Sequence, residues 1–188
     1  NSPTRHQKGS VGRILPGMEA KLVPIEGIER GGRLKVRGPN VMLGYMFSEH
    51  PGKIEPPEEG WHDTGDIVDI DTNGFVHIVG RAKRFAKVAG EMLALGTEEE
   101  IARAADPEGA HAAVSLPDPR RGERIILVTT GTVTREALSE AARRLHAPEL
   151  ALPRDVVRVE SLPLLGTGKT DYPAATQLAA EVVEAAVA

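Results

Sequence analysis

The pattern of the sequence changes near residue 80, and this change restricts the fold more than any other feature. Before it, short apolar stretches such as residues 19–23 and 33–36 are separated by glycine and proline. After it, segments with helical periodicity alternate with apolar runs. We therefore expect an α+β chain, with a small β-rich subdomain over residues 1–80 and a mixed α+β domain, a small sheet with helices, over residues 81–188.

The first part contains one strong turn signal. Asn73-Gly74 lies between two short runs of alternating apolar residues, 67–70 and 75–79. Asn-Gly accepts the positive φ angles that tight hairpin turns require. The sequence therefore predicts a β-hairpin here.

The second part predicts helices and strands in alternation. A helix is expected to begin at Thr97, whose hydroxyl would cap it ahead of an acidic first turn. Two further helices are expected over residues 134–145 and 173–187. Strands are expected over residues 112–116, 123–130 and 155–159. We expect a mixed sheet with its helices on one face.

Composition excludes several functional classes. The net charge of −4 is modest and the charges are interspersed, so a broad nucleic-acid-binding face is not expected. With no cysteine, the chain has no disulfide or thiolate chemistry, and we take the cytoplasmic side as the default location. No apolar run approaches the roughly 20 residues of a membrane span. Since Asn1 is not an initiator Met, we expect a piece of a longer protein.

The first candidate site lies in residues 61–66, Trp-His-Asp-Thr-Gly-Asp, just before the predicted hairpin. An ionised carboxylate only accepts hydrogen bonds, so a fixed Asp66 suits the two hydroxyls of a ribose. The alternative is that Asp66 simply caps a turn.

The second candidate is a cationic cluster at the expected domain boundary. It consists of Arg81, Lys83, Arg84 and Lys87, and Gly90 follows it. Such a cluster suits phosphates or an acidic partner, although a solvated strand with long cationic side chains is equally compatible.

The third candidate is the glycine-flanked Lys169 in residues 164–172, Leu-Leu-Gly-Thr-Gly-Lys-Thr-Asp-Tyr. A phosphate-binding loop of the Gly-x-x-x-x-Gly-Lys-Thr type is excluded, because Pro163 stands where its first glycine belongs. An ordinary surface loop remains the alternative. Neither His62 nor His111 has a carboxylate at a recognisable spacing, so we expect both to be structural.

Taken in order, these segments resemble the later motifs of the adenylate-forming superfamily of acyl-CoA synthetases, adenylation domains and luciferases. Residues 80–87 and 163–169 are most similar to the acyl-carrier-protein synthetase part of bacterial bifunctional 2-acylglycerophosphoethanolamine acyltransferases. The resemblance is carried by residues 9–13, 16–17, 38–45, 61–66, 80–91 and 163–172.

The resemblance implies a role for each candidate residue. Asp66 would accept hydrogen bonds from the ribose of ATP, and Arg81 would reach the same nucleotide. Lys83 would be the hinge about which a C-terminal lid rotates. Lys169 would be the catalytic lysine of adenylation, contacting the acyl carboxylate and the α-phosphate.

The resemblance also implies a thiol acceptor, the phosphopantetheine arm of acyl carrier protein or of CoA. Gly90 would leave room for that arm, and Arg84 and Lys87 would dock the acceptor. Residues 1–80 would then be the last subdomain of the large adenylating domain, and residues 81–188 the lid.

The rest of the machinery is expected upstream. The ATP phosphate-binding loop and the Mg²⁺ site of the family precede the segment that begins at Asn1, so we expect no metal site here and no activity from this piece alone. The implied whole is an ATP-dependent fatty acid ligase acting in phospholipid acyl recycling, at the inner membrane if it is fused to an acyltransferase. The alternatives are part of a fatty-acyl-CoA synthetase and a non-enzymatic module that docks a carrier protein.

Overall fold

The computed structural model describes residues 5–185 and divides into two compact units, Asn1–Lys83 and Arg84–Ala188. The sequence placed this boundary after residue 80. It falls after Lys83 because strand β7 (Phe75–Arg81) continues the ladder of the first unit as far as Arg81.

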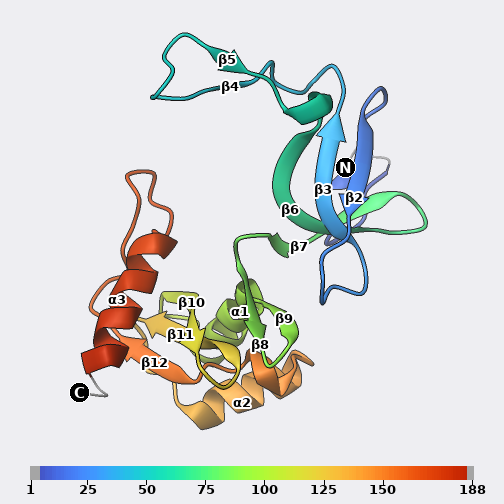
Figure 1. The fold of residues 1–188 in the computed structure, drawn as a ribbon. Coiled ribbons are helices and arrows are strands. Elements are labelled where there is room, and N and C mark those ends of the chain that lie inside the picture. The colour runs from blue at the N-terminus through green and yellow to red at the C-terminus, as the bar shows by residue number, and fades with distance from the viewer. Residues whose placement is uncertain (1–4, 186–188) are drawn as a thin grey trace. The chain divides into compact units, whose positions relative to one another are not determined.

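The first unit is built on an antiparallel five-stranded sheet in the order β1-β7-β6-β3-β2 (Figure 1). Its small core contains the buried side chains of Leu34, Val68 and Val76. A separate two-stranded hairpin, β4–β5, carries exposed apolar side chains such as Met46 and Ile54. The remaining elements are β1 (Gly12–Arg13), β2 (Glu19–Val23), β3 (Gly32–Arg37), β4 (Tyr45–Met46), β5 (Ile54–Glu55), a 3₁₀ turn η1 (Glu58–Gly60) and β6 (His62–Ile70).

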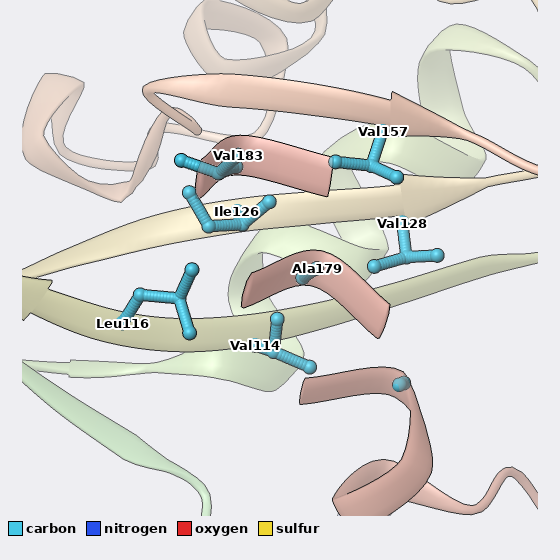
Figure 2. Close-up of a cluster of buried hydrophobic side chains, with 8 residues drawn as sticks. Val114, Leu116, Ile126, Val128, Val157, Ala179 and Val183 are labelled. Atoms are coloured by element: carbon cyan, nitrogen blue, oxygen red, sulfur yellow. The ribbon is translucent and has the colours of Figure 1, made fainter. Parts of the chain in front are cut away.

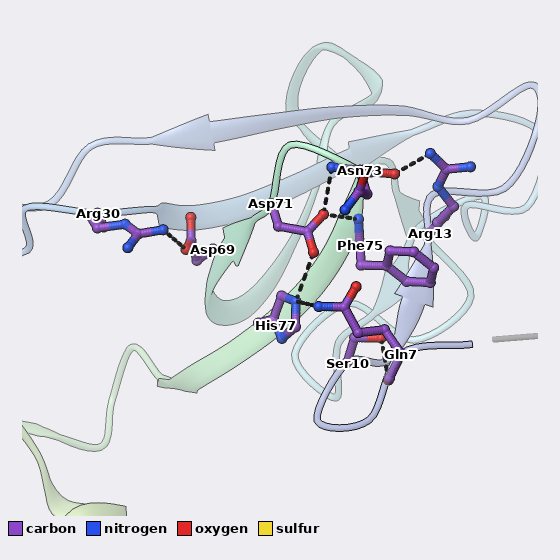
Figure 3. A network of polar contacts seen from close by, with 9 residues as sticks. All are labelled: Gln7, Ser10, Arg13, Arg30, Asp69, Asp71, Asn73, Phe75 and His77. Atoms are coloured by element: carbon purple, nitrogen blue, oxygen red, sulfur yellow. Dashed lines mark hydrogen bonds and ion pairs between the residues drawn. The ribbon is translucent and has the colours of Figure 1, made fainter. Parts of the chain in front are cut away.

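The hairpin predicted from Asn73-Gly74 is confirmed as β6–β7. Asp71 organises its turn, because Oδ1 accepts hydrogen bonds from the backbone N–H groups of Asn73 and Phe75, each at 2.9 Å (Figure 3). The Phe75 N–H, in particular, holds the pKa of Asp71 below its usual range. Gly74 supplies the positive φ of +81° that closes the loop.

The second unit contains a mixed sheet in which β11 is the central strand. It pairs antiparallel with β10 along one edge, and with parallel β12 and antiparallel β8 along the other. The elements are β8 (Phe85–Val88), β9 (Glu91–Ala94), α1 (Leu95–Ala105), β10 (His111–Asp118), β11 (Gly122–Thr129), α2 (Arg135–Arg144), a 3₁₀ turn η2 (Glu149–Ala151), β12 (Asp155–Arg158) and α3 (Tyr172–Ala185).

The helices cover both faces of this sheet, so the expectation of helices on one face is wrong. Ile126 and Val128 of β11 pack with α3 side chains such as Ala179 (Figure 2), whereas the intervening Leu127 packs with α1 and α2 through residues such as Leu138. Successive side chains of a strand point to opposite faces. An uninterrupted apolar run therefore has to be covered on both sides.

One of the two predicted helix caps is confirmed. The Thr134 hydroxyl accepts a hydrogen bond of 3.2 Å from the Ala137 N–H at the start of α2. The cap expected from Thr97 is wrong: α1 begins earlier, at Leu95, after Ala94, which makes no side-chain capping bond. Burial of Leu95 in the core explains why packing overrides the capping signal.

Two tight turns lie next to each other in the second unit. Ala89 and Gly90, with φ angles of +53° and +92°, join β8 to β9 in a hairpin. This hairpin was not predicted from the sequence. The turn between β10 and β11 is fixed by Asp118, whose Oδ1 accepts hydrogen bonds from the N–H groups of Arg120 and Arg121. The Arg121 carbonyl in turn accepts a hydrogen bond of 2.8 Å from the Ala89 N–H.

Candidate functional site

In the first unit, the structure brings Asp66 and Arg81 together. They are directly opposed across the β6–β7 ladder, and Arg81 Nε lies 2.9 Å from Asp66 Oδ1. The Asp66 side chain is 18% exposed and that of Arg81 65% exposed. Among the described residues, Asp66 Oδ1 is buried without a well-directed hydrogen bond. This carboxylate keeps capacity to accept further hydrogen bonds.

The backbone before Asp66 is held by side chains of its own motif. Gly65 adopts a φ of +72° and donates its N–H to Asp63 Oδ1 at 2.9 Å. The Thr64 hydroxyl accepts from the Asp66 N–H at 3.1 Å and donates to the Leu34 carbonyl at 2.9 Å. The glycine turn and these polar bonds therefore fix the backbone from which the Asp66 carboxylate projects.

Lys83 lies between two anchored residues. On one side, the Ala82 N–H donates to the Gly65 carbonyl at 2.8 Å within the first unit. On the other side, Arg84 is bound inside the second unit. The Lys83 side chain is exposed. The boundary between the two units thus falls at the residue predicted as the hinge.

Arg84 is engaged inside the second unit rather than at its surface. Its Nη1 donates to the Ala113 carbonyl at 2.7 Å, and its Nη2 lies 2.6 Å from Glu99 Oε1. Its guanidinium carbon lies 3.5 Å from the centre of the Tyr172 ring, and only 16% of the side chain is exposed. These contacts leave little of the Arg84 side chain exposed, and the expectation that Arg84 docks an acceptor stays a prediction.

Lys87 and Gly90 lie on the β8–β9 hairpin, and both are exposed. A Cβ atom added to Gly90 would meet nothing within 4 Å, so no neighbour within the unit requires a glycine here. Its φ of +92° supplies the conformational reason, because a tight hairpin turn needs a residue that tolerates positive φ.

Lys169 lies on an exposed loop whose base is closed by backbone hydrogen bonds. The Asp171 N–H donates to the Pro163 carbonyl at 2.9 Å, and the Leu165 N–H donates to the Lys169 carbonyl at 2.8 Å. Within residues 5–185, the Lys169 ammonium has no carboxylate within ion-pair distance. Its charge is therefore available to an anion from outside the unit.

A groove lined by three arginines lies on the same unit and was not predicted from the sequence. It has a volume of about 640 Å³, and its cationic side chains are Arg121, Arg135 and Arg154, with Glu149 and Asp155 beside them. One of its lining residues, Arg121, adjoins the Ala89-Gly90 turn, because its carbonyl accepts the hydrogen bond from the Ala89 N–H. The three arginines are far apart in sequence, which is why no motif indicated them.

A buried carboxyl group was also missed. Glu98 of α1 is fully buried, and neither of its carboxyl oxygens has a hydrogen-bond partner among the residues that the structure describes. Burial, with a smaller contribution from neighbouring Glu99, raises the pKa of Glu98 to about 9. This side chain is therefore neutral at physiological pH.

The rings of His111 and His62 contact neutral groups of the protein. Both ring nitrogens of His111 lie 2.8 Å from neutral oxygens, the Thr129 hydroxyl and the Asp106 carbonyl. The His62 ring lies near the Tyr45 ring, with 6.2 Å between centroids. Across residues 5–185, no three metal-ligating side chains form a candidate metal site, and no helix has the length and apolar character to cross a membrane.

Curated proteins similar to this chain include several CoA ligases. The chain is 32% identical over 171 residues to the probable CoA ligase CCL5 of Humulus lupulus, covering 86% of the chain and 31% of the relative. It is 33% identical over 175 residues to the mitochondrial medium-chain acyl-CoA ligase ACSF2 of Rattus norvegicus, covering 88% and 28%. It is 33% identical over 171 residues to a long-chain-fatty-acid–CoA ligase of Salmonella typhimurium, covering 87% and 30%. The chain thus spans about a third of the length of these relatives. No protein-family model matches it.

Solved structures agree on the fold. The amide bond synthetase McbA of Marinactinospora thermotolerans superimposes with a TM-score of 0.71 at 28% identity, covering 90% of the chain and 36% of McbA. ATP-bound MatB of Rhodopseudomonas palustris gives a TM-score of 0.69 at 28% identity, covering 90% and 35%. The α+β fold matches the C-terminal part of these proteins, as the sequence predicted.

Proposed function

We propose that this chain, which belongs to the acyl-CoA ligase family of adenylate-forming enzymes, is the C-terminal part of an ATP-dependent ligase. That ligase forms an acyl-AMP from a carboxylic acid and then transfers the acyl group to a thiol. The observation that carries this proposal is Lys169, an exposed ammonium without a described carboxylate partner on a loop that its own hydrogen bonds close.

Lys169 suits the first half-reaction. An oxygen of the acyl carboxylate attacks the α-phosphorus of ATP, the acyl O–P bond forms, and pyrophosphate leaves with the electrons of the broken bond. Both reacting groups are anions, so a positioned ammonium offsets their repulsion. A lysine already paired with a neighbouring carboxylate would be much less effective.

Asp66 suits the nucleotide. Its position is fixed by the Gly65 and Thr64 contacts, and a buried carboxylate oxygen remains without a well-directed hydrogen bond. Two vicinal hydroxyls of a ribose supply two donors to such a carboxylate. The Arg81 side chain stays 65% exposed although it pairs with Asp66 and donates to the Thr64 carbonyl, so Arg81 can reach the same ligand.

Lys83 suits a hinge. Anchored residues on either side, Ala82 and Arg84, confine any change of backbone angles to a short segment around it. Hinges of this kind absorb large changes in φ and ψ over a few residues at element ends. Rotation there would let one active site carry out both half-reactions in turn.

The acceptor proposed is the phosphopantetheine arm of acyl carrier protein. The arm would pass the exposed Gly90, and Lys87 with the nearby Arg121 and Arg154 would face its phosphate and the acidic carrier. A CoA acceptor is the second candidate, and it is favoured by the relatives, which are CoA ligases. Fusion to an acyltransferase and a role in phospholipid acyl recycling complete the proposal.

The longer protein that contains this chain provides the test. Lys169→Ala should lower the rate of acyl-AMP formation about 10²–10³-fold. Thioester formation from supplied acyl-AMP should fall far less. The matched control is Lys53→Ala, because Lys53 is exposed in the first unit and pairs with Glu55 at 3.3 Å. Normal acyl-AMP formation by Lys169→Ala would overturn the catalytic role of this chain and favour the alternative in which it only docks the carrier protein.

Two further measurements separate the finer alternatives. The rates of thioester formation with acyl carrier protein and with CoA should differ at least about tenfold in favour of the carrier, and the reverse preference would establish the CoA ligase. The sequence upstream of Asn1 should contain an acyltransferase and membrane segments. An upstream sequence with a synthetase domain alone would refute the fusion.

A further inference from the structure

Three side chains from separate elements of the second unit form one contact group, the Arg84 cluster (Arg84, Glu99 and Tyr172). The Arg84 guanidinium lies 2.6 Å from Glu99 Oε1 and has its carbon 3.5 Å from the centre of the Tyr172 ring. The Tyr172 hydroxyl donates to Glu99 Oε2 at 3.4 Å. Glu99 Oε1 also accepts the Ala113 N–H at 3.0 Å. Each of the three side chains contacts the other two, and little of the Arg84 and Glu99 side chains is exposed.

The cluster connects two places that the proposed function treats separately. Arg84 directly follows Lys83, at the start of the second unit. Tyr172 is the first residue of α3 and follows the loop that carries Lys169. The Asp171–Pro163 hydrogen bond closes that loop next to Tyr172. The chain on the far side of the hinge is thus tied, through one guanidinium, to the base of the Lys169 loop.

We propose that Arg84, Glu99 and Tyr172 are positioning residues for Lys169: they transmit the orientation set at Lys83 to the Lys169 loop, so that hinge rotation places the ammonium in a fixed position. This inference rests on the proposed function. It gives the contacts among these three residues a role in catalysis in addition to their role in stability.

The chemistry of the cluster requires arginine. A planar guanidinium can donate in two directions while its face lies on an aromatic ring. Here one nitrogen reaches the Ala113 carbonyl, another reaches Glu99, and the face covers Tyr172. A lysine can keep the charge but cannot make all three contacts. Because a shift of about 1 Å in a reacting group can cost about 100-fold in rate, loosening this link should affect catalysis strongly.

The experiment uses Arg84→Lys in the longer protein. We expect the kcat of acyl-AMP formation to fall roughly 10- to 100-fold while the KM for ATP stays within about twofold. Thioester formation from supplied acyl-AMP should also stay within about twofold, because Lys169 serves only the first half-reaction. A merely structural role would lower both half-reactions together.

Variants of Tyr172 keep the proposal testable if Arg84→Lys does not fold. Tyr172→Leu removes the ring and should reproduce the selective loss, whereas Tyr172→Phe keeps the ring, loses the 3.4 Å hydrogen bond, and should lose much less. Hydrogen exchange of residues 164–170 in this chain should be faster in Tyr172→Leu than in Tyr172→Phe.

Two results would overturn the inference. The first is an equal loss in both half-reactions for Arg84→Lys or Tyr172→Leu, and the second is unchanged acyl-AMP formation in the folded variants. Failure of the proposed function is distinguishable, because Lys169→Ala would then leave acyl-AMP formation intact. If Lys169→Ala abolishes that step and the cluster variants do not, only the positioning role is wrong.

Discussion

The two units differ in how the charged side chains of their candidate sites are held. In the first, Asp66 is held by its strand, by a glycine turn and by an ion pair with Arg81. In the second, Lys169 and the groove arginines are exposed, and the less exposed charged residues, such as Arg84 and Glu99, contact other groups within the unit. On the proposed function, the first unit would present a preformed ligand-binding group, whereas the exposed charges of the second unit would act on an anion delivered to them.

The largest expected effect tests whether the Asp66 carboxylate can bind a ligand or whether its ion pair with Arg81 occupies it fully. In the longer protein, Asp66→Asn should raise the KM for ATP about 10- to 100-fold, because hydrogen bonds to a charged group contribute about 1.5–3 kcal/mol. Steady-state kinetics with varied ATP would measure it. Asp69→Asn is the control, since Asp69 lies in the same strand and pairs with exposed Arg30. Equal effects of the two substitutions would assign Asp66 to folding and remove the contrast between the units.

The next effect concerns the interior of the second unit. Glu98 ionises near its ordinary pKa of 4.5 when unfolded and only near 9 when folded. Between these values the folded chain binds the extra proton, so the free energy of unfolding decreases as pH rises. Glu98→Leu should remove that slope and stabilise the chain by about 2 kcal/mol. The gain should be larger at pH 8 than at pH 5.

Urea unfolding of this chain at several pH values would measure the Glu98 effect. Glu100→Leu, on the exposed side of the same helix, is the control and should leave the slope unchanged. A slope that persists in Glu98→Leu would mean that Glu98 is hydrated or paired in solution, and the second unit would then resemble the first in satisfying its internal charge.

The smallest effect concerns the groove arginines. Arg121→Glu in the longer protein should lower the rate of thioester formation about 5- to 10-fold at low salt and less at high salt, because exposed charges act through a screened field. Acyl-AMP formation should not change. Arg143→Glu, on the exposed part of α2, is the control. Equal rates for both variants would show that the outward charges of the second unit act on no acceptor at this groove.

The sequence predicted what depends on local chemistry. Asn73-Gly74 predicted a hairpin, Thr134 predicted a helix cap, and the apolar run within residues 123–130 predicted a strand. It did not predict what depends on long-range packing. Thr97 was taken as a cap because nothing local shows that Leu95 enters the core, and the helices were placed on one face because an apolar run does not reveal what covers it.

The candidate residues divide in the same way. Asp66 and Arg81 were expected to serve the same nucleotide, and the ladder brings them together. Arg84 was grouped with its charged neighbours because spacing alone cannot distinguish a solvated arginine from one whose partners, Glu99 and Tyr172, come from distant elements. The roles of Lys169 and Lys83 remain proposals for the experiments above.

The two-sided burial of β11 has a consequence for folding fidelity. When one face of a strand is polar, a slip of one residue exposes apolar side chains and is rejected. Residues 125–128 are apolar on both faces, so hydrophobic burial alone scarcely distinguishes the native alignment from its neighbour. The Asp118 turn, with its two backbone hydrogen bonds, therefore selects the pairing of β10 with β11. Errors at this surface carboxylate would appear as misaligned, aggregation-prone chains rather than as a weakened core.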